Sequence, residues 1–135
     1  MTMSATQLRV ARPVSDLDRS VEMYCAGLGF AVLGSFRDHN GFDGTMVGEP
    51  GAAVHFEFTV CRAHPAKPSP TLEDLLVFYL PESYKWVERC SKALAAGFVE
   101  MQPFNSYWAG TGRTFEDFDG YRVVLNNAAW TEQGV

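Results

Sequence analysis

The sequence has few cysteines, and they are not arranged as disulfide or metal frameworks usually are. Cys25, Cys61 and Cys90 are odd in number and widely spaced. This pattern fits buried free thiols in a reducing compartment better than a disulfide framework or a zinc knuckle. Cys61 and His64 form a lone C-x-x-H pair with no second pair of ligands, so we predict no metal site there.

Positive charge is also scarce, and no basic run exists. Eleven Lys and Arg residues stand against 16 Asp and Glu residues, which gives a formal net charge of −5. Binding to DNA, RNA or anionic lipid needs clustered positive charge, so we expect no nucleic-acid partner and no membrane partner. No apolar run approaches the ~20 residues that cross a bilayer, and residues 1–7 lack a signal-peptide pattern. We therefore expect a cytoplasmic protein.

Apolar residues are abundant, at 47% of the 135 residues, whereas charged residues make up 20%. A chain of this length and composition can bury one compact core, so we expect a single domain over residues 1–135. The sequence contains no Gly-rich phosphate loop, nucleophile elbow or paired-cysteine site that would assign a chemistry directly.

The first half reads as a strand, a helix and three further strands. Residues 8–14 are β-compatible and stop at Ser15, which can accept a hydrogen bond from the free amides of a helix start, with Asp18 three residues later. Apolar residues then recur at helical spacing from Leu17 until Gly29 ends the helix. Strands follow at residues 30–37, 45–47 and 53–61, separated by turns at Asn40-Gly41, Asp43-Gly44 and Glu49-Pro50-Gly51.

The second half repeats this order after a proline-rich connector over residues 62–72. A strand over 74–80 precedes a helix with Pro81 in its first turn and Gly97 at its end, and strands follow at 98–102, 113–117 and 121–126. The offset between the halves is 66 residues at Val14 and Leu80, and 68 at Gly29 and Gly97. We predict an α+β fold of two βαβββ modules, about 8–61 and 73–127. The alternative is a chance arrangement of ferredoxin-like type.

Several phrases carry a family resemblance. Residues 14–20 (VSDLDRS), residues 28–30 (LGF) and residues 115–125 (FEDFDGYRVVL) resemble the opening and closing signatures of the vicinal oxygen chelate superfamily, which includes glyoxalases, bleomycin-resistance proteins and dioxygenases. Phe118 replaces the proline that is usual in the closing turn. The resemblance implies βαβββ modules that form a curved mixed sheet around a cleft, commonly in a homodimer.

The resemblance also implies where a metal would bind. In metal-dependent members, one side chain from the first and one from the last strand of each module hold a divalent ion. Aligning the strands places Arg9, Glu57, Leu75 and Val124 at these positions. Only Glu57 offers a donor atom that such an ion accepts. We therefore predict no metal and no cofactor, and we expect Arg9 to pair with Glu57 in place of the ion. The alternative is that Arg9 points to solvent and only begins the strand.

Strand alternation puts His55, Glu57 and Thr59 on one face, which the resemblance directs into the cleft. His55 and Glu57 are candidates for a general base and its orienting carboxylate; the alternative is a hydrogen-bonded pair without chemistry. Asn126 could supply a further donor. The full set of ligand-binding candidates is Arg9, His55, Glu57, Leu75, Tyr79, Tyr107, Trp108, Arg122 and Val124. For Tyr107 and Trp108, packing against the core or a dimer partner is the alternative.

The function predicted from these residues is metal-independent binding of a small organic molecule, such as sequestration of a toxic or antibiotic-like compound by a homodimer. One alternative is a lyase, isomerase or dioxygenase that uses a shifted metal site or the His55/Glu57 pair. A structural dimer with a vestigial pocket is another. Whether the protein is an enzyme stays open at this point, because one fold supports unrelated chemistries.

Overall fold

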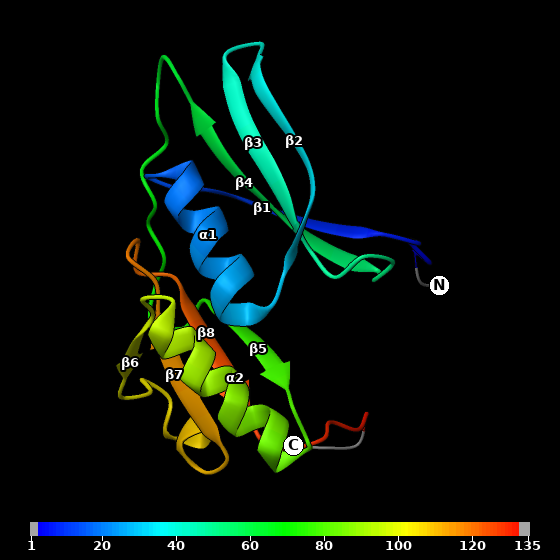
Figure 1. The fold of residues 1–135 in the computed structure, drawn as a ribbon, viewed down its shortest axis with the longest axis vertical. Coiled ribbons are helices and arrows are strands. Elements are labelled where there is room, and N and C mark those ends of the chain that lie inside the picture. Colours follow the sequence, from blue (N-terminus) through cyan, green and yellow to red (C-terminus); the bar gives the residue numbers. More distant parts are fainter. Residues whose placement is uncertain (1–2, 133–135) are drawn as a thin grey trace. The chain divides into compact units, whose positions relative to one another are not determined.

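The computed structural model describes residues 3–132 and divides into two compact units, which meet in the sequence at Pro68 and Ser69. Each unit contains a four-stranded mixed sheet with one α-helix beside it (Figure 1). The strand order is β1-β4-β3-β2 in the first unit and β5-β8-β7-β6 in the second. The identical order confirms the predicted α+β fold of two βαβββ modules.

The first unit comprises β1 (Leu8–Pro13), α1 (Leu17–Leu28), β2 (Ala31–His39), β3 (Phe42–Gly48) and β4 (Val54–Cys61). Strand β1 runs parallel to β4, and the other pairs are antiparallel. The second unit comprises β5 (Leu75–Tyr79), α2 (Ser83–Ala95), β6 (Val99–Met101), the 3₁₀ helix η1 (Ser106–Ala109), β7 (Gly112–Glu116) and β8 (Arg122–Asn126). Here β5 runs parallel to β8.

Helix α1 starts and ends close to the predicted residues. The capping residue is Asp16 and not Ser15, because the Asp16 carboxylate accepts the Arg19 backbone N–H at 3.1 Å. A cap of this kind contributes about 1 kcal/mol. At the other end Gly29 has a φ of 75°, the left-handed conformation that glycine adopts without strain.

The core of the first unit lies between α1 and one face of the sheet. Tyr24 of α1 and Phe58 of β4 are buried and meet edge to face, with ring centroids 4.9 Å apart. An aromatic pair of this geometry adds about 0.5–1.5 kcal/mol beyond its buried area. Arg12 completes this cluster, since its Nη2 donates to the Tyr24 hydroxyl at 2.7 Å. The helix therefore occupies one face and leaves the other for different side chains.

One predicted turn in the first unit is wrong. Asn40 and Gly41, with φ values of 51° and 87°, close the hairpin between β2 and β3 as predicted. Asp43 and Gly44 were also predicted to turn, but they lie inside β3. Gly44 is needed there because a Cβ at this position would collide with the ring of Phe36 on the neighbouring strand. The glycine marks a close approach of a side chain, not a reversal of the chain.

The second unit departs from the predicted pattern at its helix start. Pro81 precedes α2, and the N-cap residue is Glu82, whose side chain makes no capping hydrogen bond. The helix is held on the sheet instead: the indole N–H of Trp86 donates to the Leu125 carbonyl at 2.8 Å, and Cys90 is fully buried. Tertiary packing therefore defines this helix more than its own terminus does.

The turn between β7 and β8 explains how Phe118 is tolerated in the place of a proline. The Asp117 carboxylate accepts the backbone N–H groups of Asp119 at 2.9 Å and Tyr121 at 3.0 Å. Gly120 takes a φ of 91°. Two hydrogen bonds and one glycine in the left-handed conformation fix the turn, so the restricted φ angle of a proline is not required at position 118.

Within residues 3–132, no helix has both the length and the apolar composition that crossing a bilayer requires.

Two glycines flanking the loop before β7 give a matched stability test. A Cβ at Gly112 would lie 2.6 Å from the Trp108 carbonyl oxygen, whereas a Cβ at Gly110 would have no neighbour closer than 3.9 Å. We expect Gly112→Ala to lower the free energy of unfolding by roughly 1–3 kcal/mol, because a backbone carbonyl cannot move aside cheaply. Gly110→Ala should change it by less than about 0.5 kcal/mol. Equal urea midpoints for the two variants would contradict the packing described.

Candidate functional site

The face of the first sheet opposite α1 carries a row of polar side chains, here called the open face. Strand β4 buries Phe56 and Phe58 against the helix and turns His55, Glu57 and Thr59 the other way. The parallel register then sets Arg9 opposite His55 and Ala11 opposite Glu57. These two strands bring together the candidates that the sequence predicted for the first module.

The predicted ion pair between Arg9 and Glu57 is confirmed. Arg9 Nη1 lies 3.3 Å from Glu57 Oε2, with 48% of the Arg9 side chain and 14% of the Glu57 side chain exposed. Because water screens the arginine, a pair of this kind contributes only about 0–1 kcal/mol to stability. Its main effect is to hold a positive charge beside a carboxylate that faces away from the helix.

His55 is held by hydrogen bonds at both ring nitrogens. Arg9 Nε donates to His55 Nε2 at 2.8 Å, and Gln7 Nε2 lies 2.8 Å from His55 Nδ1. A guanidinium can only donate, so His55 Nε2 must be unprotonated and the ring proton sits on Nδ1. With the proton on Nδ1, Gln7 acts as its acceptor only when the amide oxygen, and not Nε2, faces the ring. The sequence did not predict this contact of Arg9.

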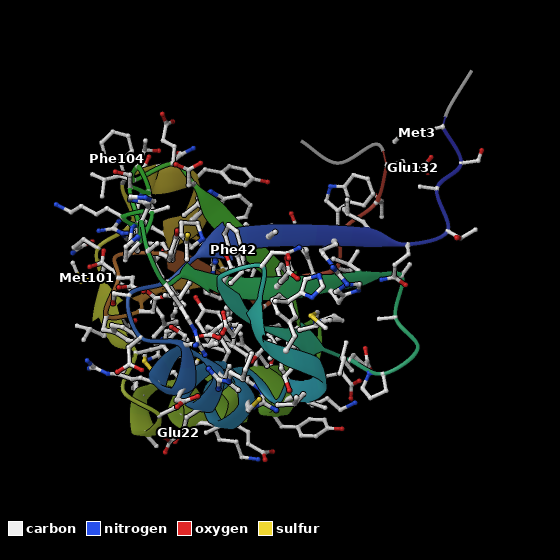
Figure 2. The ribbon with its side chains drawn as sticks, turned by 90° about the horizontal axis from the view of Figure 1, so that it is seen from above. Met3, Glu22, Phe42, Met101, Phe104 and Glu132 are labelled. Atoms are coloured by element: carbon white, nitrogen blue, oxygen red, sulfur yellow. The ribbon has the colours of Figure 1, made fainter. Side chains whose placement is uncertain are left out.

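Next to the polar row lies a cavity of about 500 Å³. Two aromatic rings from the hairpin, Phe36 and Phe42, line it together with Pro13 and the polar groups of Glu57 and Thr59. Figure 2 shows Phe42 on this hairpin, away from helix α1, on which Glu22 is labelled. The cavity is lined in full by Ala11, Arg12, Pro13, Phe36, His39, Asn40, Phe42, Glu57, Thr59 and Ala66.

The two phenylalanines and His39 were missed as site residues. His39 is exposed, as expected for a residue beside a turn, yet it also lines the cavity. The hairpin register brings these residues to the open face, and that register shifts between Phe36 and His39. Such a shift is not visible in the sequence, because a one-residue slip reverses which face each side chain occupies.

The ligand-binding candidates of the second unit range from exposed to fully buried. Tyr79 and Tyr107 are exposed and line a second cavity of about 250 Å³ together with Asn126. Trp108 is half-buried and packs edge to face on Tyr107, with centroids 4.9 Å apart. Leu75 is half-buried, and Val124 is fully buried.

Arg122 was predicted as a ligand-facing donor, but its charge is already used. Its side chain is 7% exposed, and its Nε donates to Glu116 Oε2 at 2.9 Å. Glu116 lies directly opposite on β7, so this is a cross-strand pair within the second sheet. Removing one partner of a buried pair is costly, and we assign Arg122 to holding β7 on β8.

The donor chemistry does not fit the divalent ion of metal-dependent superfamily members. Glu57 supplies oxygen donors, whereas Arg9 is a cation and Leu75 and Val124 are hydrocarbon. Over residues 3–132, no cluster of three or more His, Cys, Asp or Glu side chains has the spacing to hold a metal ion. These residue types therefore do not form the metal site that the superfamily resemblance implies.

The three cysteines are free thiols, but of the predicted buried thiols only Cys90 is buried, whereas Cys25 and Cys61 are partly exposed. Burial raises the pKa of the Cys90 thiol, which disfavours the thiolate form that acts as a nucleophile or metal ligand. Beside it, the pKa of the Glu100 carboxyl is lowered by its hydrogen bonds from Arg113, at 2.7 and 2.9 Å. This partly exposed ion pair links β6 to β7.

Family comparisons match both halves of the chain. The YycE-like N-terminal domain matches residues 8–59, and the YycE-like C-terminal domain matches residues 73–127. The uncharacterized protein YycE of Bacillus subtilis is 39% identical over 127 residues, which is 94% of this chain and 91% of that protein. A crystal structure of YycE from this organism, described as a candidate glyoxalase/fosfomycin resistance protein of unknown function, has a TM-score of 0.89 at 38% identity and covers 96% of this chain and 95% of its own.

More distant solved structures share the fold. Glyoxalase I of Leishmania major has a TM-score of 0.69 at 19% identity, covering 90% of this chain and 86% of its own. TnmS3, an antibiotic binding protein from Streptomyces sp. CB03234, has a TM-score of 0.64 at 24% identity, covering 93% and 97%. At these identities the likeness shows the glyoxalase/bleomycin-resistance fold and nothing about ligands.

The hydrogen bonds of His55 predict its tautomer. In long-range ¹H–¹⁵N NMR spectra at neutral pH, we expect Nε2 of His55 to show the shift of an unprotonated nitrogen, because Arg9 donates to it. Arg9→Met removes the donor and should return His55 to a mixture dominated by the Nε2–H tautomer. The exposed His39 and His64 serve as controls in the same spectra. A protonated Nε2 on His55 in the unmodified protein would contradict the geometry.

Proposed function

We propose that this chain, which belongs to the YycE-like family, binds a small organic molecule on the open face of its first sheet without using a metal ion. The observation that carries the proposal is the 500 Å³ cavity lined by Glu57, whose carboxylate pairs with Arg9, the residue that the family resemblance aligns with a metal ligand. Storing or sequestering such a molecule, for example a toxic or antibiotic-like compound, is the activity we infer. The homodimer and cytoplasmic location expected from the sequence belong to this proposal.

The size and lining of the cavity support this proposal. Small-molecule sites typically span about 300–1,000 Å³, with mainly apolar walls and a few polar groups that fix orientation. The cavity has this composition: Phe36 and Phe42 offer ring surfaces, and Glu57 and Thr59 offer polar atoms. Phe42 is exposed, so its ring has apolar surface that a ligand would remove from water.

The polar groups indicate what the ligand presents. A carboxylate only accepts hydrogen bonds, so Glu57 favours a ligand that carries a hydroxyl, amide or amine donor. Arg9 already holds one oxygen of that carboxylate at 3.3 Å, which leaves acceptor capacity for a second donor. We therefore propose a ligand with an apolar ring portion against the phenylalanines and a donor group toward Glu57.

A catalytic role for His55 and Glu57 is less well supported than binding. Both ring nitrogens of His55 already have partners, Arg9 and Gln7. A general base needs a free lone pair within reach of the proton that it removes. Acid–base catalysis would require Arg9 to leave Nε2 first, whereas binding requires no rearrangement of this network.

The binding proposal can be tested by a thermal-shift screen of ring-containing compounds with and without amine or hydroxyl groups. Compounds that bind should raise the melting temperature equally in EDTA and in added Zn²⁺, Ni²⁺ or Mn²⁺. At 100 times the dissociation constant, a ligand should add about 2.7 kcal/mol of stability. Phe42→Ala and Glu57→Gln should each weaken binding of the best compound at least fivefold.

A control on the same sheet separates loss of the site from loss of fold. Val32 is exposed on β2 and does not line the cavity, so Val32→Ala should leave ligand affinity unchanged. A compound that stabilises the protein only when a divalent ion is present would overturn the metal-independent proposal. So would about one tightly held transition-metal ion per chain after dialysis.

A further inference from the structure

The smaller cavity of the second unit is lined by three aromatic rings that the proposed function does not use. Tyr79 ends β5, Tyr107 lies in η1, and Trp130 lies in the segment after β8. All three are exposed, so their faces or edges are open to a ligand. The cavity is lined in full by Tyr79, Tyr107, Gly110, Thr111, Asn126, Ala128, Ala129, Trp130 and Thr131, all within the second unit.

A buried amide lies among these rings. Asn126 is 5% exposed and lines the cavity. Its Oδ1 is 2.6 Å from the Thr111 hydroxyl oxygen. This distance is typical of O–H···O and short for N–H···O, so the oxygen of the amide faces Thr111 and accepts its proton. The Nδ2 group is therefore the end of Asn126 that is left for a ligand.

Within residues 3–132 the Nδ2 group of Asn126 makes no hydrogen bond, and it does not belong to the buried side-chain atoms that lack a partner, so it is accessible from the cavity that Asn126 lines. Because the group reaches the surface of the cavity, an acceptor that enters the cavity can take the place of water on this donor. The acceptor must come from water or from a ligand. This requirement specifies the ligand's polar group: an oxygen with a free lone pair.

The lack of charged side chains in the cavity indicates that the ligand is uncharged. Among its lining residues in the described part of the chain there is no carboxylate, ammonium, guanidinium or imidazole. A cation could lie over the aromatic rings, but the N–H donor of Asn126 would repel it. An anion would have no positively charged side chain to pair with. A neutral planar ring suits Tyr79, Tyr107 and Trp130, because aromatic rings stack offset or edge to face.

We propose that this cavity binds a single uncharged planar ring that carries a carbonyl oxygen, with the oxygen accepting from Asn126 Nδ2 and the ring packing on Tyr79, Tyr107 and Trp130. About 250 Å³ accommodates one ring with a short substituent. This inference rests on the second unit alone and does not depend on the proposed function of the first.

The test uses four probes on the full chain, with binding followed by NMR titration. Acetophenone has the planar ring and the carbonyl, cyclohexyl methyl ketone lacks the planar ring, phenyltrimethylammonium is a cation and benzoate is an anion. We expect acetophenone to bind at least fivefold more tightly than each of the other three. It should perturb the indole N–H signal of Trp130 more than those of Trp86 and Trp108.

Variants assign the binding to named atoms. Trp130→Ala and Tyr107→Ala change exposed residues and should each weaken acetophenone binding at least fivefold. Asn126→Asp keeps an oxygen to accept from Thr111 but replaces the donor by an acceptor, so it should abolish acetophenone binding and favour phenyltrimethylammonium. Tyr84→Ala is the matched control, because Tyr84 is an exposed aromatic of α2 outside the cavity, and it should leave the affinity unchanged.

Three results would overturn the inference: acetophenone binding that Trp130→Ala leaves unchanged, tighter binding of the cation than of acetophenone by the unmodified protein, or no binding of acetophenone at all. Phe42→Ala keeps the two proposals separable. If that substitution abolishes acetophenone binding and Trp130→Ala does not, the ring binds in the first unit and this inference is wrong, while the proposed function stands.

Discussion

The alternation of side chains along β4 is the constraint on which the first unit depends. Phe56 and Phe58 must face α1 to close the core around Tyr24, and this fixes His55, Glu57 and Thr59 on the other side. A shift of one residue would bury the carboxylate of Glu57 and expose two phenylalanine rings, at a cost of several kcal/mol. The geometry of the polar row is therefore set by hydrophobic packing on the opposite face.

Much of the fold could be predicted because its signals are local. Periodic apolar residues defined the two helices, and Asn40-Gly41 and Gly29 showed where the chain must adopt positive φ. The wrong predictions concern residue types that occur in more than one structural setting. Gly44 reads as a turn residue, yet it serves the close approach of Phe36, and Pro81 reads as a first-turn proline, yet it precedes the cap. Deciding between such uses needs the neighbouring strand or helix.

The site could be predicted only in part. Residues were placed correctly where the register of their strand was known, and they were missed where the register shifts. Arg9 and Glu57 come from paired strands whose alignment the resemblance supplied, and their ion pair is present. Phe36 and Phe42 come from a hairpin whose register slips, so their place beside Glu57 was not predictable. Arg122 aligns with His55 in the duplicated pattern, yet it is paired with Glu116, because the residue opposite it on β7 decides its partner.

In the proposed function, Arg9 takes the place that a metal ligand has in metal-dependent relatives, and its chemistry differs from that of an ion. A divalent ion polarises two oxygens of a substrate because its coordination positions are open. The guanidinium has fixed N–H directions, and two of these are taken by His55 Nε2 and Glu57 Oε2. It neutralises the charge of the Glu57 carboxylate and holds it in place. Unlike a metal ion, it has no open coordination position that two vicinal oxygens could occupy. Such a charge can hold a site ready for a ligand, whereas the stabilisation of an enolate would demand the freedom of coordination that it lacks.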